Sequence, residues 1–219
     1  MILAIDTSIG SAVAVVGLDG AVRGVAESAG TLGHAEIVGT LLERALAEAG
    51  AAPSDITHVA AGMGPGAFTG LRIGIAAARA FALGRGIDVV PVPSHEAAAL
   101  SHAGEPAGRA AEGRIAIVTD ARRRENAITV FEGVTDAGLP RVVGGPELRP
   151  QTADLATDPL TAGSEIVRTA TIAAAAVGRV AALMLSGGWR PTGALAETEP
   201  LYLRSPDVTV GHVPKKVRA

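Results

Sequence analysis

The sequence predicts an α/β protein built from two lobes that share one plan. Apolar strand-like segments alternate with helical segments along 219 residues, a length that allows one large domain or two small lobes with real cores. A strand, an acidic turn and a returning strand occur twice, beginning at 2–6 and again at 115–120. Between them, 103–113 is rich in glycine, alanine and charge, so we expect one lobe at 1–103 and another at 104–219.

The first half begins with three strand-like segments and a helix. Apolar runs at 1–5 and 12–16 flank a turn composition, and an Asp-Gly pair then introduces a third run at 21–26. An amphipathic helix is expected over 35–49, because apolar residues recur there every three or four positions. These residues are Ile37, Val38, Leu41, Leu42, Ala45, Leu46 and Ala49.

The stretch 57–83 is the centre of the first half. It predicts a buried strand at 58–61, a glycine-rich loop at 62–70 and a helix at 71–83. The loop lacks the lysine of a Walker loop, and Thr69 stands where a dinucleotide fingerprint has its third glycine. We therefore favour a structural turn, although free amides at the start of the helix leave an anion-binding role open.

The helix at 71–83 is apolar on nearly all sides, with Arg72 and Arg79 as its charged residues. Such a helix must be covered on nearly all sides. Small residues recur four positions apart on it, a spacing that lets a second helix pack closely. They are Gly74, Ala76, Ala78 and Ala80. The helix is therefore either buried inside one domain or shared with another chain.

The rest of the chain continues the alternation. In the first half we expect a strand at 86–92 and a short helix at 95–102. The segment 151–164 is turn-like and is assigned to no element. The second half is expected to contain strands at 115–120, 127–131 and 141–143, a helix at 171–185, and an extended end at 189–206 whose Tyr202, Leu203 and Arg204 pack back onto the first lobe.

Composition argues against several classes of protein. Without cysteine, neither disulfides nor thiolate metal sites are available. A hydrophobic content of 48% and a charged content of 19% are typical of a globular protein, and no window is apolar enough for a membrane span. No secretion signal follows Met1, so we expect a cytoplasmic protein. A net charge of −3 and an aromatic content of 2% argue against direct RNA binding.

Four segments resemble the TsaB (YeaZ) family, in the family's order. The clearest is Gly-Pro-Gly-Ala-Phe-Thr-Gly-Leu-Arg-Ile-Gly at 64–74, with Ala67 where serine is common. The others are 2–8, 119–122 and 200–204, so the resemblance spans nearly the whole chain. Proteins of this family help to make threonylcarbamoyladenosine in bacterial tRNA. The resemblance implies two lobes of the actin-like, sugar-kinase-like ATPase (ASKHA) fold, each with the order β-β-β-α-β-α.

The resemblance also implies a non-catalytic scaffold. In this family the two helices of the first lobe pair with matching helices of TsaD, the subunit that modifies the adenosine beside the anticodon. TsaE, a small ATPase, is the third partner, a homodimer can use the same surface, tRNA is contacted only indirectly, and no membrane is involved. The expected interface residues are Ile37, Val38, Leu41, Leu42, Ala45, Ile73, Gly74, Ala76, Ala77, Ala80 and Phe81. The family's motif loop comprises Gly64, Pro65, Gly66, Phe68, Thr69, Gly70 and Arg72.

Two aspartates occupy turns where catalytic members of this superfamily hold magnesium and nucleotide phosphate. Asp6 is followed by Thr7 and Ser8, and Asp120 by alanine and arginine, so we interpret these four named positions as vestigial phosphate-loop positions or turn caps. No two of the five histidines are four residues apart, and no nucleophile elbow is present. We therefore expect no catalytic residue, no metal and no cofactor on this chain alone, with ATP or ADP bound only at the level of a complex.

Two alternative functions are compatible with the same residues. A stand-alone ATPase or small-molecule kinase of the same superfamily would have to bind Mg-ATP tightly by itself, which calorimetry tests. A self-associating structural protein without a link to tRNA would be recognised from its mass with and without the sister subunit. The arginines at 122–124 form either a solvated turn or a contact to tRNA phosphate in the complex.

Overall fold

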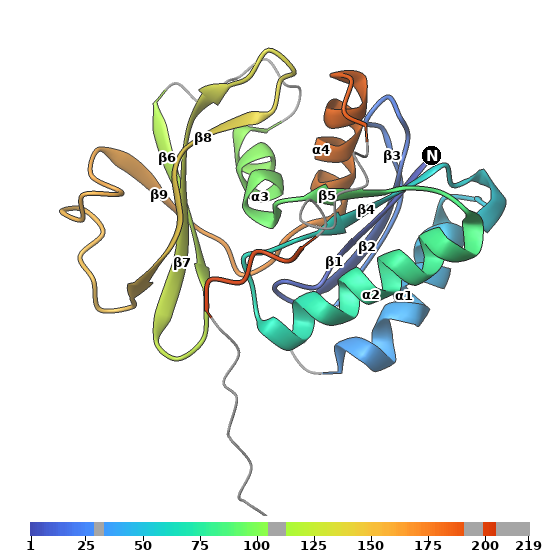
Figure 1. Ribbon diagram of the computed structural model, residues 1–219, viewed down its shortest axis with the longest axis horizontal. Helices are drawn as coiled ribbons and strands as arrows, with labels where there is room; N and C mark the ends of the chain where they lie inside the picture. Colours follow the sequence, from blue (N-terminus) through green and yellow to red (C-terminus); the bar gives the residue numbers. More distant parts are fainter. Residues whose placement is uncertain (29–32, 105–112, 191–198, 205–219) are drawn as a thin grey trace, which may run out of the picture.

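A computed structural model describes residues 1–28, 33–104, 113–190 and 199–204, and the statements below concern these residues. They form two β-sheets that stand beside each other, with two helices between them (Figure 1). Most of the expected linker at 103–113 lies outside the described residues, as does much of the extended end at 189–206.

The first sheet has five strands in the order β3-β2-β1-β4-β5. Strand β1 pairs antiparallel with β2 and parallel with β4, so the opening hairpin and the later crossover meet on the same central strand. This agrees with the three opening runs predicted from the sequence. The strands are β1 Ile2–Asp6, β2 Ser11–Val16, β3 Val22–Ser28, β4 His58–Gly62 and β5 Val89–Val92.

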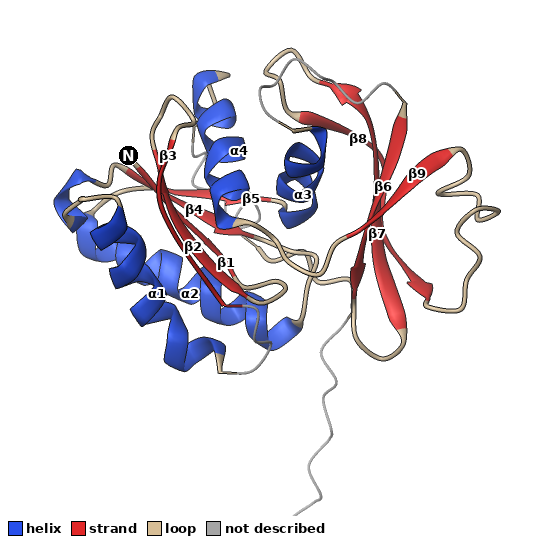
Figure 2. Cartoon of the chain, turned by 180° about the vertical axis from the view of Figure 1, so that it is seen from behind, coloured by secondary structure: helices blue, strands red, loops and turns tan. Residues whose placement is uncertain are grey.

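Helices cover both faces of this sheet. The helices are α1 His34–Glu48, α2 Phe68–Arg85, α3 Ser94–Ala103 and α4 Ala174–Ser186, with a short 3₁₀ turn at Pro53–Asp55. Side chains alternate between the faces of β1, so Leu3 packs with α1 and α2, whereas Ile2 packs with α4. Figure 2 shows α1 and α2 together on one face and α4 on the other. Helix α2 ends where Gly86 adopts a left-handed φ of 65°.

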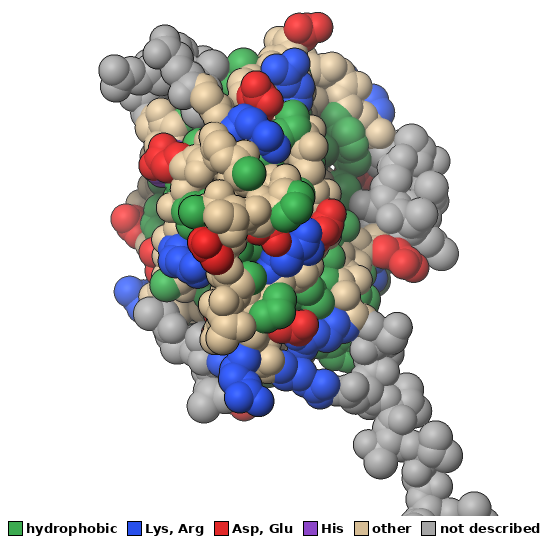
Figure 3. All heavy atoms as spheres, turned by 90° about the vertical axis from the view of Figure 1, so that its left-hand side faces the viewer, with side chains coloured by type: hydrophobic (Ala, Val, Ile, Leu, Met, Phe, Trp, Pro, Cys, Tyr) green, Lys and Arg blue, Asp and Glu red, His purple; other side chains and the backbone are tan. Residues whose placement is uncertain are grey.

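The second sheet repeats the core of the first. Its order is β8-β7-β6-β9, and β6 pairs antiparallel with β7 and parallel with β9, as β1 does with β2 and β4. The strands are β6 Arg114–Asp120, β7 Glu125–Val134, β8 Pro140–Pro150 and β9 Ser164–Arg168. Figure 3 views the molecule from the side of the second sheet, and the surface there mixes acidic, basic and apolar side chains.

The predicted fold class, a two-lobed α/β protein with a duplicated actin-like plan, is confirmed, with two local differences. Turns at 151–163 stand where the first lobe has α1, so the second copy lacks that helix, and the chain then enters β9, a strand that the sequence did not predict. Strand β8 spans 11 residues instead of the expected three. Helix α4 comes from the second half of the sequence but packs mainly on the first sheet.

The small residues of α2 serve two different surfaces. Gly74 was expected to allow a helix of another chain to approach. It instead lies against Thr7, in the turn that follows β1, and a side chain at position 74 would collide with the threonine side chain. Ala78 is fully buried in the same core. Ala76 and Ala80 are exposed, so only this second pair of small residues is available to a partner.

Candidate functional site

The outward side of α1 and α2 carries apolar residues that the chain does not fully cover. Leu83 is 85% exposed, and Ala76 and Ala80 are also exposed. Five further residues of the two helices are half-buried and pack against the edge of the core: Ile37, Leu42, Ile73, Ala77 and Phe81. We call the whole set the outer helix face: Ile37, Leu42, Ile73, Ala76, Ala77, Ala80, Phe81 and Leu83.

Four residues expected at a partner interface belong instead to the interior. Val38, Leu41 and Ala45 are buried on the side of α1 that packs on the first sheet, and Gly74 is buried against Thr7. These residues are apolar or small because they pack inside the first lobe. The expected contact with a partner therefore does not include them. Leu83, which was not among the expected interface residues, is the most exposed large hydrophobic residue in the described part of the chain.

The motif loop is held in place by a buried network around Asp6. The Asp6 carboxylate accepts hydrogen bonds from the Ser8 amide at 2.8 Å, the Ser8 hydroxyl at 2.5 Å and the Ser94 hydroxyl at 2.6 Å. Ser94 in turn accepts a hydrogen bond from the Gly64 amide at 3.0 Å. Burial raises the pKa of Asp6, and these hydrogen bonds from serine oppose the rise. Both oxygens of the Asp6 carboxylate thus accept hydrogen bonds within the chain, Oδ1 from Ser8 and Oδ2 from Ser94.

Close approach explains the glycines of this loop. A Cβ on Gly66 would lie 2.6 Å from the Cβ of Ser8, and one on Gly62 would overlap the Asp6 carboxylate. The Thr7 hydroxyl donates to the Gly70 carbonyl at 2.6 Å and accepts from the Gly74 amide at 3.0 Å. Residues 6–8 thus hold the motif loop and the first turns of α2 close to the end of β1.

The turn after β6 repeats this capping on the surface. Asp120 accepts a hydrogen bond from the Arg122 amide at 2.8 Å, as Asp6 does from the Ser8 amide, and another from the Gln151 side chain at 3.3 Å. Asp120 is exposed, whereas Asp6 is buried, so the same local hydrogen bond occurs in two different settings. The described residues contain no group of three or more His, Asp or Glu side chains that could hold a metal ion.

Arginines 122–124 adopt an unusual backbone. Their φ angles are 65°, 53° and 62°, the left-handed region that L-residues other than glycine and asparagine seldom occupy. The turn is closed by hydrogen bonds from the Ala121 amide to the Glu125 carbonyl, at 2.9 Å, and from the Glu125 amide to the Arg122 carbonyl, at 3.1 Å. This conformation fixes where the arginine side chains leave the backbone.

The segment 199–204 packs back onto the first lobe, as predicted. The Leu201 amide donates to the Met63 carbonyl at 2.8 Å, and the Tyr202 ring lies 4.7 Å from the Phe68 ring, centre to centre. Arg72 stacks 3.8 Å from the centre of the Phe68 ring and donates to the Tyr202 hydroxyl at 3.2 Å. Two motif-loop residues, Phe68 and Arg72, therefore anchor this segment, a role that the sequence did not reveal.

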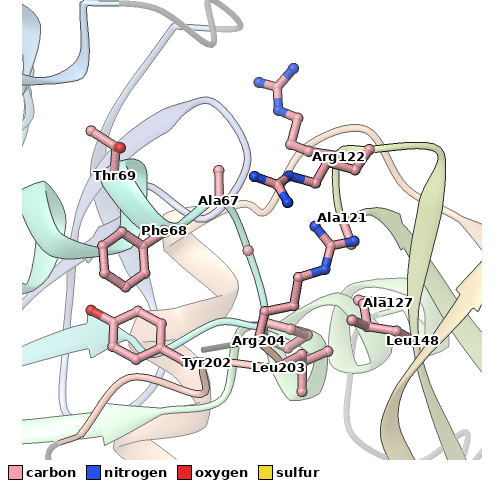
Figure 4. Close-up of a pocket in the computed structure, with 13 residues that line it drawn as sticks. Ala67, Phe68, Thr69, Ala121, Arg122, Ala127, Leu148, Tyr202, Leu203 and Arg204 are labelled. Atoms are coloured by element: carbon pink, nitrogen blue, oxygen red, sulfur yellow. The ribbon is translucent and has the colours of Figure 1, made fainter. Parts of the chain in front are cut away.

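A cleft opens between these parts, and we call it the arginine cleft (Figure 4). Its volume is about 460 Å³, and its walls are the motif loop, the turn after β6 and the segment 202–204. Arg122, Arg123 and Arg204 line it. Arg204 forms an ion pair with Glu125.

His95 belongs to α3 and is buried between this helix and the second sheet. Its two ring nitrogens lie 2.8 Å from the Thr129 hydroxyl and 2.9 Å from the Thr119 hydroxyl, which joins α3 to β6 and β7. Burial lowers the pKa of His95 to about 3, so its ring is neutral at physiological pH. The two hydrogen bonds satisfy the polar atoms of the buried ring, so His95 is accounted for as part of the core packing.

Comparisons with known proteins give sequence matches of two kinds. A family model described as "TsaD: tRNA N6-adenosine threonylcarbamoyltransferase" matches residues 21–137. A tRNA N6-adenosine threonylcarbamoyltransferase of Streptococcus pneumoniae (strain ATCC 700669 / Spain 23F-1) is 42% identical over 69 residues, which is 32% of this chain and 20% of that relative. The match therefore spans about a fifth of the length of the curated relative.

Two solved structures from Pseudomonas aeruginosa are similar over most of the chain. One is described as an uncharacterized protein with similarity to peptidase YEAZ; it has a TM-score of 0.73 at 25% identity and covers 93% of this chain and 99% of that one. The other is YeaZ, with a TM-score of 0.74 at 23% identity, covering 92% and 99%. No helix in the described residues combines the length and apolar content needed to cross a membrane.

Proposed function

We propose that this chain, which belongs to the tRNA N6-adenosine threonylcarbamoyltransferase (TsaD) family and has the fold of YeaZ (TsaB), is a non-catalytic subunit that binds and activates a TsaD-type transferase. The family match and the YeaZ fold bear out the resemblance seen in the motif at 64–74 and connect the chain with threonylcarbamoyladenosine synthesis in tRNA. An uncovered apolar helix surface and an already engaged Asp6 support the subunit role.

The outer helix face is the observation that carries this proposal. Leu83 is almost fully exposed, and its neighbours Ala76 and Ala80 leave room for a second helix to approach closely. Covering apolar area contributes about 25 cal/mol per Å², so a partner that buries this face gains stability from it. Leu83 and the exposed Ala76 and Ala80, beside half-buried Ile73 and Phe81 on the same helix, offer an apolar strip that a partner helix could cover.

The family match suggests which partner fits. The segment matched by the TsaD model, 21–137, contains both α1 and α2. A transferase of this family therefore carries a related pair of helices, and two related apolar surfaces can pair about a pseudo-two-fold axis. For the same reason two copies of this chain can pair through the outer helix face, in competition with the transferase.

The turn after β1 supports a non-catalytic role for this chain. Asp6, which stands where catalytic relatives hold magnesium, is buried and engaged by Ser8 and Ser94. We propose that the transferase carries the reaction and makes most of the contact with tRNA in the cytoplasm, and that a TsaE-type ATPase is the third component. Nucleotide that drives the reaction would then be bound by those partners.

Charge placed on the outer helix face tests the proposal. Ala80→Glu introduces a charged side chain at an exposed position of α2, whereas the matched control Ala162→Glu makes the same change at an exposed position beside the second sheet. We expect Ala80→Glu to stay folded but to lose co-purification with a TsaD-type subunit and tRNA modification in the reconstituted system. Ala162→Glu should retain both. Equal pairing by both variants would contradict the proposed surface.

A further inference from the structure

A cavity separate from the arginine cleft lies at the edge of the first sheet where β4 and β5 begin. The motif loop follows the end of β4, so it lies at the opposite edge. The start of the chain, labelled N in Figure 1, marks the edge of the cavity, because Ile2 pairs with His58. The volume of about 430 Å³ is within the range of small-ligand sites, about 300–1,000 Å³. We call it the edge pocket, and its walls include Leu18, His58, Asp88, Leu185, Trp189 and Arg190.

Strand register places the polar side of the edge pocket. Strands β4 and β5 are parallel neighbours, so His58 and Asp88 lie side by side where the strands begin. Two residues further on, Ala60 and Val90 pack in the core that includes α4. Because side chains alternate between the faces of a sheet, His58 and Asp88 occupy the α4 side as well. The end of α4 and Trp189 enclose the pocket from that side.

Opposite charges line the edge pocket without pairing with each other. Asp88 is exposed, and its carboxylate has no ion pair or hydrogen bond within the described part of the chain. Arg190 Nη1 donates to the Leu185 carbonyl at 3.4 Å and the Trp189 carbonyl at 2.6 Å, and its other guanidinium nitrogens have no partner among the described residues. Burial lowers the pKa of His58; Asp88 opposes this shift, and the chain's amino terminus and Arg190 add to it. An anion and a cation therefore act on one small space, and each is available to a ligand.

The other walls of the edge pocket are apolar. Leu18, in the turn between β2 and β3, is 54% exposed, and Trp189 is half-buried. An apolar group placed between them would remove their surface from water, which is favourable. His58 Nδ1 lies 3.1 Å from the Thr57 hydroxyl, and Nε2 has no partner among the described residues, so this nitrogen can bond to a ligand. The pocket thus combines two opposite charges, one free ring nitrogen and an apolar wall.

We propose that the edge pocket binds a free α-amino acid with an apolar side chain. Its ammonium group pairs with Asp88, its carboxylate pairs with Arg190, and its side chain lies against Leu18 and Trp189. A zwitterion matches both charges, whereas a simple anion would meet Asp88 and a simple cation would meet Arg190. Guanidinium and carboxylate also form paired, charge-assisted hydrogen bonds. This inference goes beyond the proposed partner role and does not depend on it.

Fluorescence of Trp189, the single tryptophan of the chain, reports binding in the edge pocket. The probes are L-leucine and L-phenylalanine, with N-acetyl-L-leucine lacking the ammonium, L-leucinamide lacking the carboxylate and glycine lacking the side chain. We expect leucine or phenylalanine to change the emission saturably, and the other three to bind about tenfold more weakly. Calorimetry on the same samples measures the affinities independently. Absence of binding by both leucine and phenylalanine overturns the proposal, and equal binding of N-acetyl-L-leucine or L-leucinamide contradicts the assigned charges.

Substitutions locate the binding. Asp88→Asn keeps the shape of the side chain and removes its charge, so we expect it to weaken leucine binding about tenfold and to leave N-acetyl-L-leucine nearly unaffected. Arg190→Gln should do the same for leucine and spare L-leucinamide, with circular dichroism as the check that α4 stays folded. Glu27→Gln removes an exposed carboxylate at the opposite edge of the same sheet and is the matched control. Unchanged leucine affinity in both pocket variants would overturn the assignment.

The two proposals fail separately. Ala80→Glu should bind leucine as the natural chain does while losing the transferase, and Asp88→Asn should keep the transferase while losing leucine affinity. Loss of leucine binding by Ala80→Glu, in a chain that remains folded, would contradict the edge pocket as a separate site.

Discussion

Adding a single methyl group to α2 at Gly74 should destabilise the protein, although alanine is a better helix former than glycine. The new Cβ would overlap the Thr7 hydroxyl and lie 3.2 Å from both Thr7 Cβ and Cγ2. Overpacking of this kind costs about 1–3 kcal/mol. Weakening the hydrogen bonds that the Thr7 hydroxyl makes with Gly70 and Gly74 adds about 1 kcal/mol. Helix propensity returns about 1 kcal/mol, which leaves a net loss of about 1–3 kcal/mol.

The same helix provides the matched control. A Cβ on Gly84 would meet nothing within 4 Å, so Gly84→Ala should stabilise the protein by about 0.5–1 kcal/mol through helix propensity alone. Urea unfolding followed by circular dichroism measures both changes, with the m-value as a check that the unfolded state is the same. If Gly74→Ala stabilised the protein as Gly84→Ala does, the close packing of Thr7 on α2 would be refuted.

Two further changes test the buried groups. Thr7→Val keeps the shape but removes the hydroxyl that serves Gly70 and Gly74, so urea unfolding should show a loss of about 1–3 kcal/mol that Thr7→Ser largely avoids; equal losses would argue against the hydrogen bonds. Burial raises the pKa of Glu96 from 4.5 to about 7, so its stabilising contribution is complete below about pH 4.5 and is lost as the pH rises through about 7. Glu96→Gln should therefore gain stability relative to the natural chain at about pH 8 compared with about pH 5, and a pH-independent difference would contradict this assignment.

The alternating pattern predicted most of the fold because periodicity reports which face of an element is covered. Each of the helices predicted from 35–49, 71–83, 95–102 and 171–185 is present, within a few residues of its expected bounds. Strand β9 was missed because Ser164–Arg168 is short and carries two charged residues, so its pairing with β6 comes from the sheet rather than from local preference.

The candidate site was predicted less completely, because periodicity does not say what does the covering. Val38 and Leu41 follow the same apolar pattern as Leu42, yet the first two face the chain's own sheet. Gly74 and Ala80 look alike as small helix residues, but Thr7 occupies the space beside Gly74. The arginine cleft joins residues 65–69, 121–127 and 202–204, whose meeting depends on how the two halves of the chain pack.

Hydrogen exchange measured by mass spectrometry on this chain, with and without a TsaD-type transferase, tests the central claim most directly. We predict slower exchange on binding in peptides from α1 and α2, with little change in peptides from β7 and β8. Protection confined to the second sheet, in a complex that has demonstrably formed, would contradict the assignment of the outer helix face as the partner surface.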